Sequence, residues 1–369
     1  MRVLVTGHDG YIGTVLSELL QAAGHDVSGL DAGLFHACAF SPAAAVPARR
    51  ADVRDVAPLD GVEAVVHLAN LSNDPLGNLR PGLTAAINHR ATVRFARAAR
   101  EAGVSRFVFA SSCSLYGAAG EDDVDETAAF NPQTPYGEAK VLAERDLLPL
   151  AGRDFSPVFL RNATVYGVSP RLRFDLVVNN LTAWAVATGR VRMLSDGSPW
   201  RPLVHVRDVA AAAVAAVEAP REAVHGEAFN VGRAGENYQI RDVAEIVGRE
   251  VPGCRVTFAP GASPDTRSYR VSFGKIAERL PAWRPTWTVP DGVREVRDAL
   301  AAWTAQAGAP LPPAVFEGPR FSRIAHLQTL LETGTLGPDL RWTAPPPPFG
   351  AARPARSAVP RAASPPSAL

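Results

Sequence analysis

The stretch "RVLVTGHDGYIGTVLSELLQAAG", residues 2–24, decides the fold. Its first five residues form a short apolar run typical of a buried strand, and a helical pattern runs from residue 11 to Gly24. Glycines stand between the two at positions 7, 10 and 13. In a strand–turn–helix unit, the first glycine allows a tight turn, the second lets a diphosphate approach the backbone, and the third lets the helix pack on the sheet. The stretch therefore predicts a dinucleotide-binding turn, with a diphosphate facing the N-terminus of the helix.

Strand and helix patterns alternate through the first half of the chain. Further strands are predicted at 26–31, 62–69, 106–112 and 156–161, and helices at 84–102 and 137–149. Such alternation predicts an α/β fold of the Rossmann type, in which helices cover both faces of a doubly wound parallel sheet. Beyond about residue 165, helices and short strands mix with longer loops, which predicts a smaller, mixed α/β substrate lobe.

An acidic residue, Asp31, ends the second predicted strand. A carboxylate at this place can accept hydrogen bonds from both hydroxyls of an adenosine ribose, and it repels a 2′-phosphate, so the sequence predicts NAD rather than NADP. Asp52, in "ADV" (51–53), could meet the adenine amino group. A simple turn residue is an equally good interpretation of an Asp in a loop.

The stretch "TPYGEAK" (134–140) holds an unusual residue for this chain, because only Lys140 and Lys275 among the 38 basic residues are lysines. Lys140 follows Tyr136 by four positions, which places both on one face of the predicted helix. The stretch "SSCSLYG" (111–117) puts hydroxyl groups at the C-terminal end of a predicted strand, where the ligand crevices of parallel sheets lie. Ser112, Tyr136 and Lys140 are therefore expected to meet at one crevice.

These three side chains suggest a specific chemistry. An ammonium group and the positive nicotinamide ring of NAD favour the phenolate of Tyr136 and lower its pKa from about 10. Tyr136 could then take a proton from a sugar hydroxyl while the carbon gives hydride to NAD, with Ser112 hydrogen-bonded to the same oxygen. A slim ammonium also reaches ribose hydroxyls where a guanidinium fork does not fit, which explains a lysine at position 140.

Together these motifs resemble the extended short-chain dehydrogenase/reductase family, most closely its nucleotide-sugar epimerase/dehydratase branch, which includes UDP-glucose 4-epimerase. The matching elements run in family order along most of the chain: "VTGHDGYIG" (5–13), "LD" (30–31), "ADVRD" (51–55), "HLAN" (67–70), "SSCSLYG", "TPYGEAK", "LRNATVYG" (160–167) and "WRPLVHVRDVA" (200–210).

The resemblance implies roles for individual residues. It implies a catalytic set of Ser112, Tyr136 and Lys140. The expected NAD contacts are Gly7, Gly10, Tyr11, Ile12, Gly13, Asp31, Asp52, Val53, Leu68, Ala69, Asn88, Tyr136 and Lys140. The expected substrate contacts are Ser72, Ser112, Thr164, Asn180, Arg201 and Arg267.

The substrate contacts differ in their basis. Arg201 and Arg267 are implied as ligands of a substrate diphosphate, whereas arginine elsewhere in this chain is interpreted as surface filler. Ser72 opens the loop "SNDPLGNL" (72–79), which either holds sugar hydroxyls or is a turn. Thr164 stands where relatives that bind UDP-hexoses often have Asn.

A second departure from the family bears on the reaction. Dehydratases place an Asp-Glu pair, and decarboxylases a Glu, just after the catalytic hydroxyl, whereas this chain has Cys113 and Ser114. Elimination of water then has no evident general acid. The sequence therefore predicts an NAD-dependent epimerase of a nucleotide-diphosphate sugar that works through a transient keto-sugar. The alternatives are an NAD(P)-dependent sugar ketoreductase, dehydrogenase or dehydratase and, in another class, a non-catalytic NAD-sensing regulator.

Charge, cysteine spacing and hydropathy argue against several other classes of protein. The net charge is +1, so no basic field indicates nucleic acid or an anionic membrane as a partner. Cys38, Cys113 and Cys254 are widely spaced, which indicates reduced thiols and predicts no metal site. The start "MRVLVTG" does not resemble a signal peptide, and no apolar stretch reaches membrane-spanning length. A cytoplasmic homodimer is expected.

The expected organisation has three parts. Residues 1–165 are predicted to form the NAD-binding domain, to which 206–231 return. Residues 166–205 and 232–343 are predicted to form the substrate lobe, which ends with an appended amphipathic helix in "RFSRIAHLQTLLETG" (320–334). Residues 344–369 are rich in Pro and Ala with little to bury, so a disordered tail is predicted there.

Overall fold

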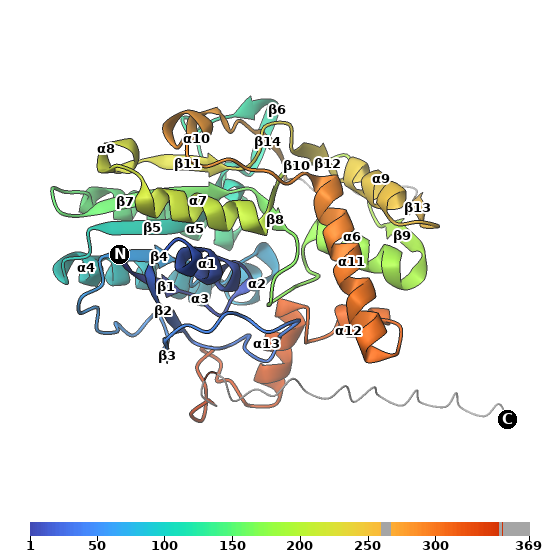
Figure 1. Ribbon diagram of the computed structural model, residues 1–369, viewed down its shortest axis with the longest axis horizontal. Coiled ribbons are helices and arrows are strands. Elements are labelled where there is room, and N and C mark those ends of the chain that lie inside the picture. The colour runs from blue at the N-terminus through green and yellow to red at the C-terminus, as the bar shows by residue number, and fades with distance from the viewer. Residues whose placement is uncertain (260–266, 347–348, 350–369) are drawn as a thin grey trace.

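The computed structural model describes residues 1–259, 267–346 and 349, and its centre is a seven-stranded sheet (Figure 1). Its strands follow the order β11-β7-β5-β4-β1-β2-β3, and every neighbouring pair is parallel. Their bounds are β1 (Arg2–Thr6), β2 (Asp26–Asp31), β3 (Ala48–Arg50), β4 (Ala64–His67), β5 (Arg106–Ser112), β7 (Ser156–Asn162) and β11 (Ala228–Val231). The predicted Rossmann-type sheet is confirmed.

Helices cover both faces of this sheet, because side chains alternate between its faces along each buried strand. The covering helices are α1 (Tyr11–Ala22), α7 (Val206–Glu218), α4 (Thr92–Glu101) and α5 (Pro135–Leu147). Figure 1 shows α1 and α7 in front of the sheet and α4 and α5 behind it. Val108 of β5 belongs to the core cluster that contains residues of α1 and α7. Its neighbours Phe107 and Phe109 belong to the cluster that contains residues of α4 and α5.

A second lobe is built from three helices that contact one another and from small sheets. Its helices are α6 (Val177–Thr188), α9 (Ile240–Glu250) and α11 (Val289–Ala307). Its strands are β8 (Thr164–Tyr166), β10 (Trp200–His205), β12 (Asn237–Gln239), β9 (Arg190–Met193) and β13 (Arg255–Phe258). Because β11 joins the edge of the central sheet and α7 covers it, the chain re-enters the first lobe between two parts of the second. The predicted domain limits remain a proposal.

The remaining elements are short. They are α2 (Asp74–Leu79), α3 (Pro81–Thr84), the 3-10 turns η2 (Cys113–Tyr116) and η3 (Leu148–Leu150), β6 (Ala118–Val124), α8 (Arg221–Val224), β14 (Ser268–Val271), α10 (Gly274–Arg279) and α12 (Pro313–Phe316). The helix expected at 84–102 is interrupted, since residues Ala85–Ala91 form a π-helical segment, η1, ahead of α4. Within η1, Asn88 exchanges two hydrogen bonds with the backbone of Leu71, at 2.8 and 2.9 Å.

The C-terminal part of the chain returns to the first lobe. The appended helix expected from the sequence is present as α13 (Arg323–Glu332), which contacts α2. Figure 1 shows the segment that follows α13 running beside β2 and β3. Of the predicted tail, the structure describes residues 344–346 and Phe349, whose ring lies against His8 and Arg50. The remainder of 344–369 lies outside the described residues.

Two absences hold for the described part of the chain. None of its helices is both long and apolar enough to cross a membrane. No group of three or more His, Cys, Asp or Glu side chains in it is placed to hold a metal ion.

The first testable prediction concerns the glycine turn. A methyl group at Gly13 would overlap the carbonyl oxygen of Gly7 and lie 2.7 Å from the Cα atom of His8, both of which are backbone atoms that cannot move aside. We expect Gly13→Ala to lower the free energy of unfolding by about 1–3 kcal/mol in denaturant titrations. The matched control is Gly82→Ala in α3, where nothing lies within 4 Å of an added Cβ. Equal effects of the two substitutions would contradict this account of the turn.

Candidate active site

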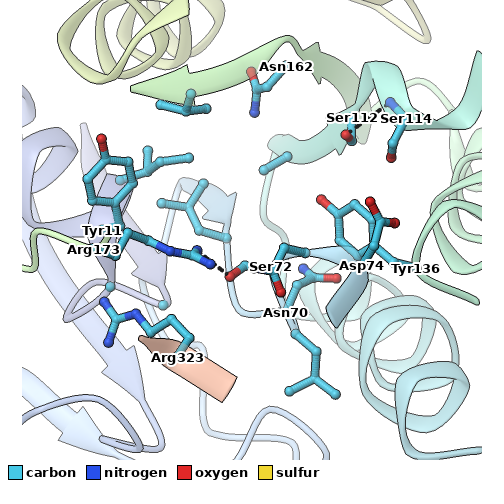
Figure 2. Close-up of a pocket in the computed structure, with 18 of the residues that line it drawn as sticks. Tyr11, Asn70, Ser72, Asp74, Ser112, Ser114, Tyr136, Asn162, Arg173 and Arg323 are labelled. Atoms are coloured by element: carbon cyan, nitrogen blue, oxygen red, sulfur yellow. Dashed lines mark hydrogen bonds between the residues drawn. The ribbon is translucent and has the colours of Figure 1, made fainter. Parts of the chain in front are cut away.

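A cavity of about 590 Å³ opens at the C-terminal edge of the central sheet. Its lining comes from residues at or just after the ends of six parallel strands, β1, β2, β3, β4, β5 and β7, and from the second lobe across the opening. Ligand crevices of open α/β sheets lie at this edge, where the strand order reverses between β1 and β4. Figure 2 shows polar side chains from both lobes around this cavity.

The catalytic corner is built by the start of α5 and the end of β5. Thr134 caps α5, because its hydroxyl accepts the N–H of Gly137 at 3.2 Å, and Pro135 opens the helix. This start places Tyr136 in the first turn, with Lys140 one turn later. The Nζ atom of Lys140 lies 5.5 Å from the centre of the Tyr136 ring, and Ser112 ends β5 beside them. The structure thus brings the three predicted catalytic residues together.

Burial opposes charge on both titratable groups of this corner. It raises the pKa of Tyr136 to about 12, although a hydrogen bond with Ser112 acts in the opposite direction. Burial also lowers the pKa of Lys140 to about 7, against the attraction of the Glu144 carboxylate. The expected lowering of the Tyr136 pKa is therefore not a property of the protein alone, and it would require the positive charge of a bound nicotinamide ring.

A buried polar network supports Lys140 from below. Lys140 donates to the carbonyl of Ala110, and its ammonium lies 4.6 Å from the ring centre of Phe109. Glu144, on the same helix, accepts from Ser111 and from Nε and Nη2 of Arg161, the latter two at 3.1 and 2.7 Å. These bonds tie β5, α5 and β7 together directly beneath the reacting groups.

The glycine turn forms the opposite wall of the cavity. Gly7 has a φ of +76°, and a side chain there would press on the backbone of Ala69 at 2.9 Å. The carboxylate of Asp31 accepts the backbone N–H groups of Gly33, at 2.6 Å, and Asp9, at 3.2 Å. The predicted NAD contacts that line the cavity are Gly7, Gly10, Tyr11, Ile12, Gly13, Asp31, Asp52, Val53, Leu68, Ala69, Tyr136 and Lys140.

Asp52 lines this wall but is already engaged. Its carboxylate accepts from Arg54 in a two-pronged contact, at 2.9 and 2.5 Å, and from the backbone N–H of the same residue at 2.8 Å. Each carboxylate oxygen has further acceptor capacity, so the contact with an adenine amino group remains a prediction.

Two predicted contacts do not line the cavity. Asn88 spends its amide on the backbone of Leu71, and so it positions the strand-end loop. The amide of Asn180 donates to the carbonyl of Phe174 at 2.8 Å. Both side chains bond to backbone groups, and no sequence motif predicts these partners.

The other predicted substrate residues, Ser72, Ser112, Thr164, Arg201 and Arg267, do line the cavity. The hydroxyl of Ser72 accepts from Arg173 at 2.9 Å, as Figure 2 shows. Arg201 donates to the backbone carbonyls of Trp200, at 2.7 Å, and Arg267. Arg201 is buried, and these two carbonyls hold its guanidinium in place at the substrate side of the cavity.

Sequence reasoning missed several polar residues of this cavity. Asp74 lies beside Tyr136 in Figure 2, where it accepts from Thr134 at 2.6 Å and forms an ion pair with Arg267. Arg173 is buried and forms a two-pronged ion pair with Asp175. The loop at 72–79 was a signal for Asp74, because one interpretation of this loop was that it holds sugar hydroxyls. Arg173 and Asp175 belong to no motif.

Comparisons with known proteins agree with this geometry. Residues 3–232 match the model of the NAD dependent epimerase/dehydratase family. UDP-glucose 4-epimerase of Mycolicibacterium smegmatis is 32% identical over 313 residues, which cover 79% of this chain and 96% of that protein. The structure of MoeE5 in complex with UDP-glucuronic acid and NAD has a TM-score of 0.71 at 27% identity and covers 83% of this chain and 100% of its own. Thermus thermophilus UDP-glucose 4-epimerase in complex with NAD has a TM-score of 0.66 at 26% identity, covering 81% and 98%.

The burial of Lys140 gives a prediction for the protein without cofactor. Because its folded pKa is lowered to about 7 from the ordinary 10.5, the unfolded state binds more protons between these two values, so this residue's contribution to stability rises with pH. We expect Lys140→Met to have a higher free energy of unfolding than the wild type at pH 7. We expect this difference to become smaller towards pH 9. Urea unfolding of both proteins across this range measures the difference, in which the contributions of other titrating groups cancel. If this difference stayed constant or grew with pH, burial would not lower the pKa of Lys140.

Proposed function

Because the chain belongs to the NAD-dependent epimerase/dehydratase family, we propose that it is an NAD-dependent epimerase that inverts one carbon of a nucleotide-diphosphate sugar through a transient keto-sugar. The single observation that carries the proposal is the convergence of Ser112, Tyr136 and Lys140 on one cavity, between the glycine turn and the second lobe. A regulator that only senses NAD needs no such acid–base set.

Each residue of this corner has a separate role in the proposed reaction. Ser112 and Tyr136 hold the oxygen of the reacting hydroxyl, and Tyr136 takes its proton. Lys140 stabilises the phenolate and binds the nicotinamide ribose through N–H groups that Ala110 leaves available. NAD, when bound, would supply hydride acceptance and return, and the glycine turn and Lys140 would hold it at this corner. Tyr136 then gives the proton back when the ketone is reduced on its opposite face.

The chemistry next to Ser112 favours epimerisation over elimination. Cys113 follows Ser112, its thiol is fully buried and donates to the carbonyl of Arg161 at 3.0 Å, and burial raises the pKa of that thiol. It therefore offers no acid at the position where dehydratases carry a carboxylic acid. Asp74 is the carboxylate beside Tyr136, but both its oxygens already accept hydrogen bonds, from Thr134 and Arg267. Rotation and re-reduction of a ketone need no further acid or base.

The substrate assignment rests on the second lobe and on the relatives. Arg201 and Arg267 place cations on the substrate side of the cavity, where a diphosphate would pair with them. C4 of a hexose or uronic acid is the proposed carbon, since related proteins are UDP-glucose 4-epimerases and MoeE5 is seen with UDP-glucuronic acid. Thr164 gives the sugar pocket a shorter side chain than the Asn of many relatives. The expected homodimer and cytoplasmic location remain predictions.

Product analysis tests the reaction. UDP-, dTDP-, GDP- and CDP-sugars are incubated with the NAD-loaded enzyme, and the products are read by mass spectrometry and proton NMR. We expect an unchanged mass with a new H4 and anomeric pattern for the accepted sugar. Loss of one water would identify a dehydratase, and accumulation of NADH would identify a dehydrogenase, so either result ends the epimerase proposal.

Two substitutions test the catalytic corner. We expect Tyr136→Phe and Lys140→Arg each to reduce turnover by about a hundredfold or more. The Arg variant keeps the charge but has no room, because Lys140 is only 2% exposed and lies against Phe109. The matched control is Lys275→Arg at the other lysine, which is ion-paired with Glu227 at 2.8 Å and should keep full activity. Near-normal turnover of Lys140→Arg would mean that only the charge of Lys140 matters.

A further inference from the structure

We propose that the C-terminal extension, residues 323–346, is part of the cofactor site: it closes the adenosine side of the cavity, and Arg323 binds the NAD diphosphate. The inference rests on the NAD dependence of the family and not on the epimerase reaction, and it assigns a role to a segment far from every family motif in the sequence.

The extension is anchored to the loops that carry the predicted adenosine contacts. The indole N–H of Trp342 donates to the carbonyl of Ala32, next to Asp31, at 2.8 Å. The backbone carbonyl of Asp339 accepts from Arg54, the residue that grips Asp52, also at 2.8 Å. The extension therefore supports the loops of both carboxylates that were predicted to meet the adenosine.

A second anchor fixes the same stretch of the extension. Arg341 forms a two-pronged ion pair with Asp55, at 2.6 and 2.9 Å. Planar pairing of this kind sets the orientation of the two side chains as well as their distance. Together with the Asp339 carbonyl, this contact holds the loop on both sides of Leu340.

Leu340 forms part of the cavity wall at an energetic cost. It is 2% exposed, it lines the cavity, and it belongs to the core cluster that contains Val53 and Leu71. Its φ is +59°, a left-handed conformation that costs a non-glycine residue about 1–2 kcal/mol. The contacts of Asp339, Arg341 and Trp342 hold this conformation, which turns the apolar side chain of Leu340 towards the cavity.

Arg323 is the residue of the extension that points to a ligand. It is 3% exposed, and its guanidinium lies 4.1 Å from the ring centre of Phe35. Its Nη2 donates to the carbonyl of Arg171 at 3.3 Å, whereas its Nη1 is buried without a hydrogen-bond partner among the described residues. The neighbouring thiol of Cys38 is only a weak acceptor, so this buried charged donor favours a stronger acceptor than the protein supplies.

The position of Arg323 identifies that acceptor. It lines the same cavity as the glycine turn and as Tyr11, the first residue of α1, and Figure 2 shows it below Arg173. The N-terminus of α1 is where a dinucleotide places its diphosphate. The nearby arginines already have carboxylate partners, Asp175 for Arg173 and Asp9 for Arg171. Of these three described arginines, Arg323 is thus the one without a paired carboxylate, and it is the one we assign to a phosphate oxygen.

The arrangement has a kinetic consequence. Because Trp342 and Arg341 are anchored to the loops after β2 and β3, we expect NAD to leave faster once this segment detaches. An enzyme that oxidises and re-reduces its substrate in one cycle gains from such retention, because its cofactor never needs to be exchanged.

The test of Arg323 measures binding and not activity. Arg323→Met keeps an unbranched apolar stem on Phe35 and removes the charge. We expect titration calorimetry to show NAD and ADP affinities lowered by tenfold or more, as for the loss of a hydrogen bond to a charged group, with adenosine binding unchanged. The matched control is Arg320→Met, since Arg320 donates to the carbonyl of Ala39 and does not line the cavity. Unchanged NAD affinity, or an equal loss for adenosine, would overturn the assignment.

A second variant tests closure independently. The double change Arg341→Ala and Trp342→Ala removes both anchors, and we expect NAD to dissociate at least tenfold faster after rapid dilution of the loaded protein. Its melting temperature without cofactor reports whether the fold survives. An unchanged dissociation rate in a folded double variant would refute closure, whatever the product assays show about epimerisation.

Discussion

The burial of one ammonium group, that of Lys140, is the constraint on which the rest of the active site depends. Removing a cation from water is expensive unless it is paired and hydrogen-bonded. The protein offsets this cost with the carbonyl of Ala110, the face of Phe109 and the charge of Glu144, which come from β5 and from the same helix. These partners fix the distance between β5 and α5, and that distance places Tyr136 beside Ser112.

The same logic extends through the second layer of polar groups. Glu144 does not face Lys140 alone, because Arg161 and Ser111 also share its carboxylate. Arg161 in turn donates to the hydroxyl of Tyr116, which donates to Asn230 on β11. A continuous hydrogen-bonded path thus joins α5 to the far strand of the sheet. Its members are buried, so the loss of one partner would leave the others unsatisfied.

Several arginines have a structural role that their abundance in the sequence did not indicate. Its interpretation as surface filler was wrong for Arg161, Arg171, Arg173 and Arg323, all of which are buried. The first three hold carboxylates beside the cavity, and the fourth belongs to the extension. A planar guanidinium suits such sites because it binds a carboxylate or phosphate with two parallel bonds and remains charged. Composition counts these residues but does not report their partners.

The sequence by itself determined the elements whose signals are local. A strand, a glycine turn and a helix within 23 residues determined the cofactor turn, and the spacing of Tyr136 and Lys140 determined that they share one helical face, because helix geometry acts over a single turn. Only the tertiary structure placed Asp74, Asn88, Leu340 and Arg323 beside their partners. Their partners lie far away along the chain, or belong to the backbone, and such contacts leave no periodic trace in the sequence. The physical reason is that burial and pairing depend on which distant segments pack together, and this is settled only when the whole chain has folded.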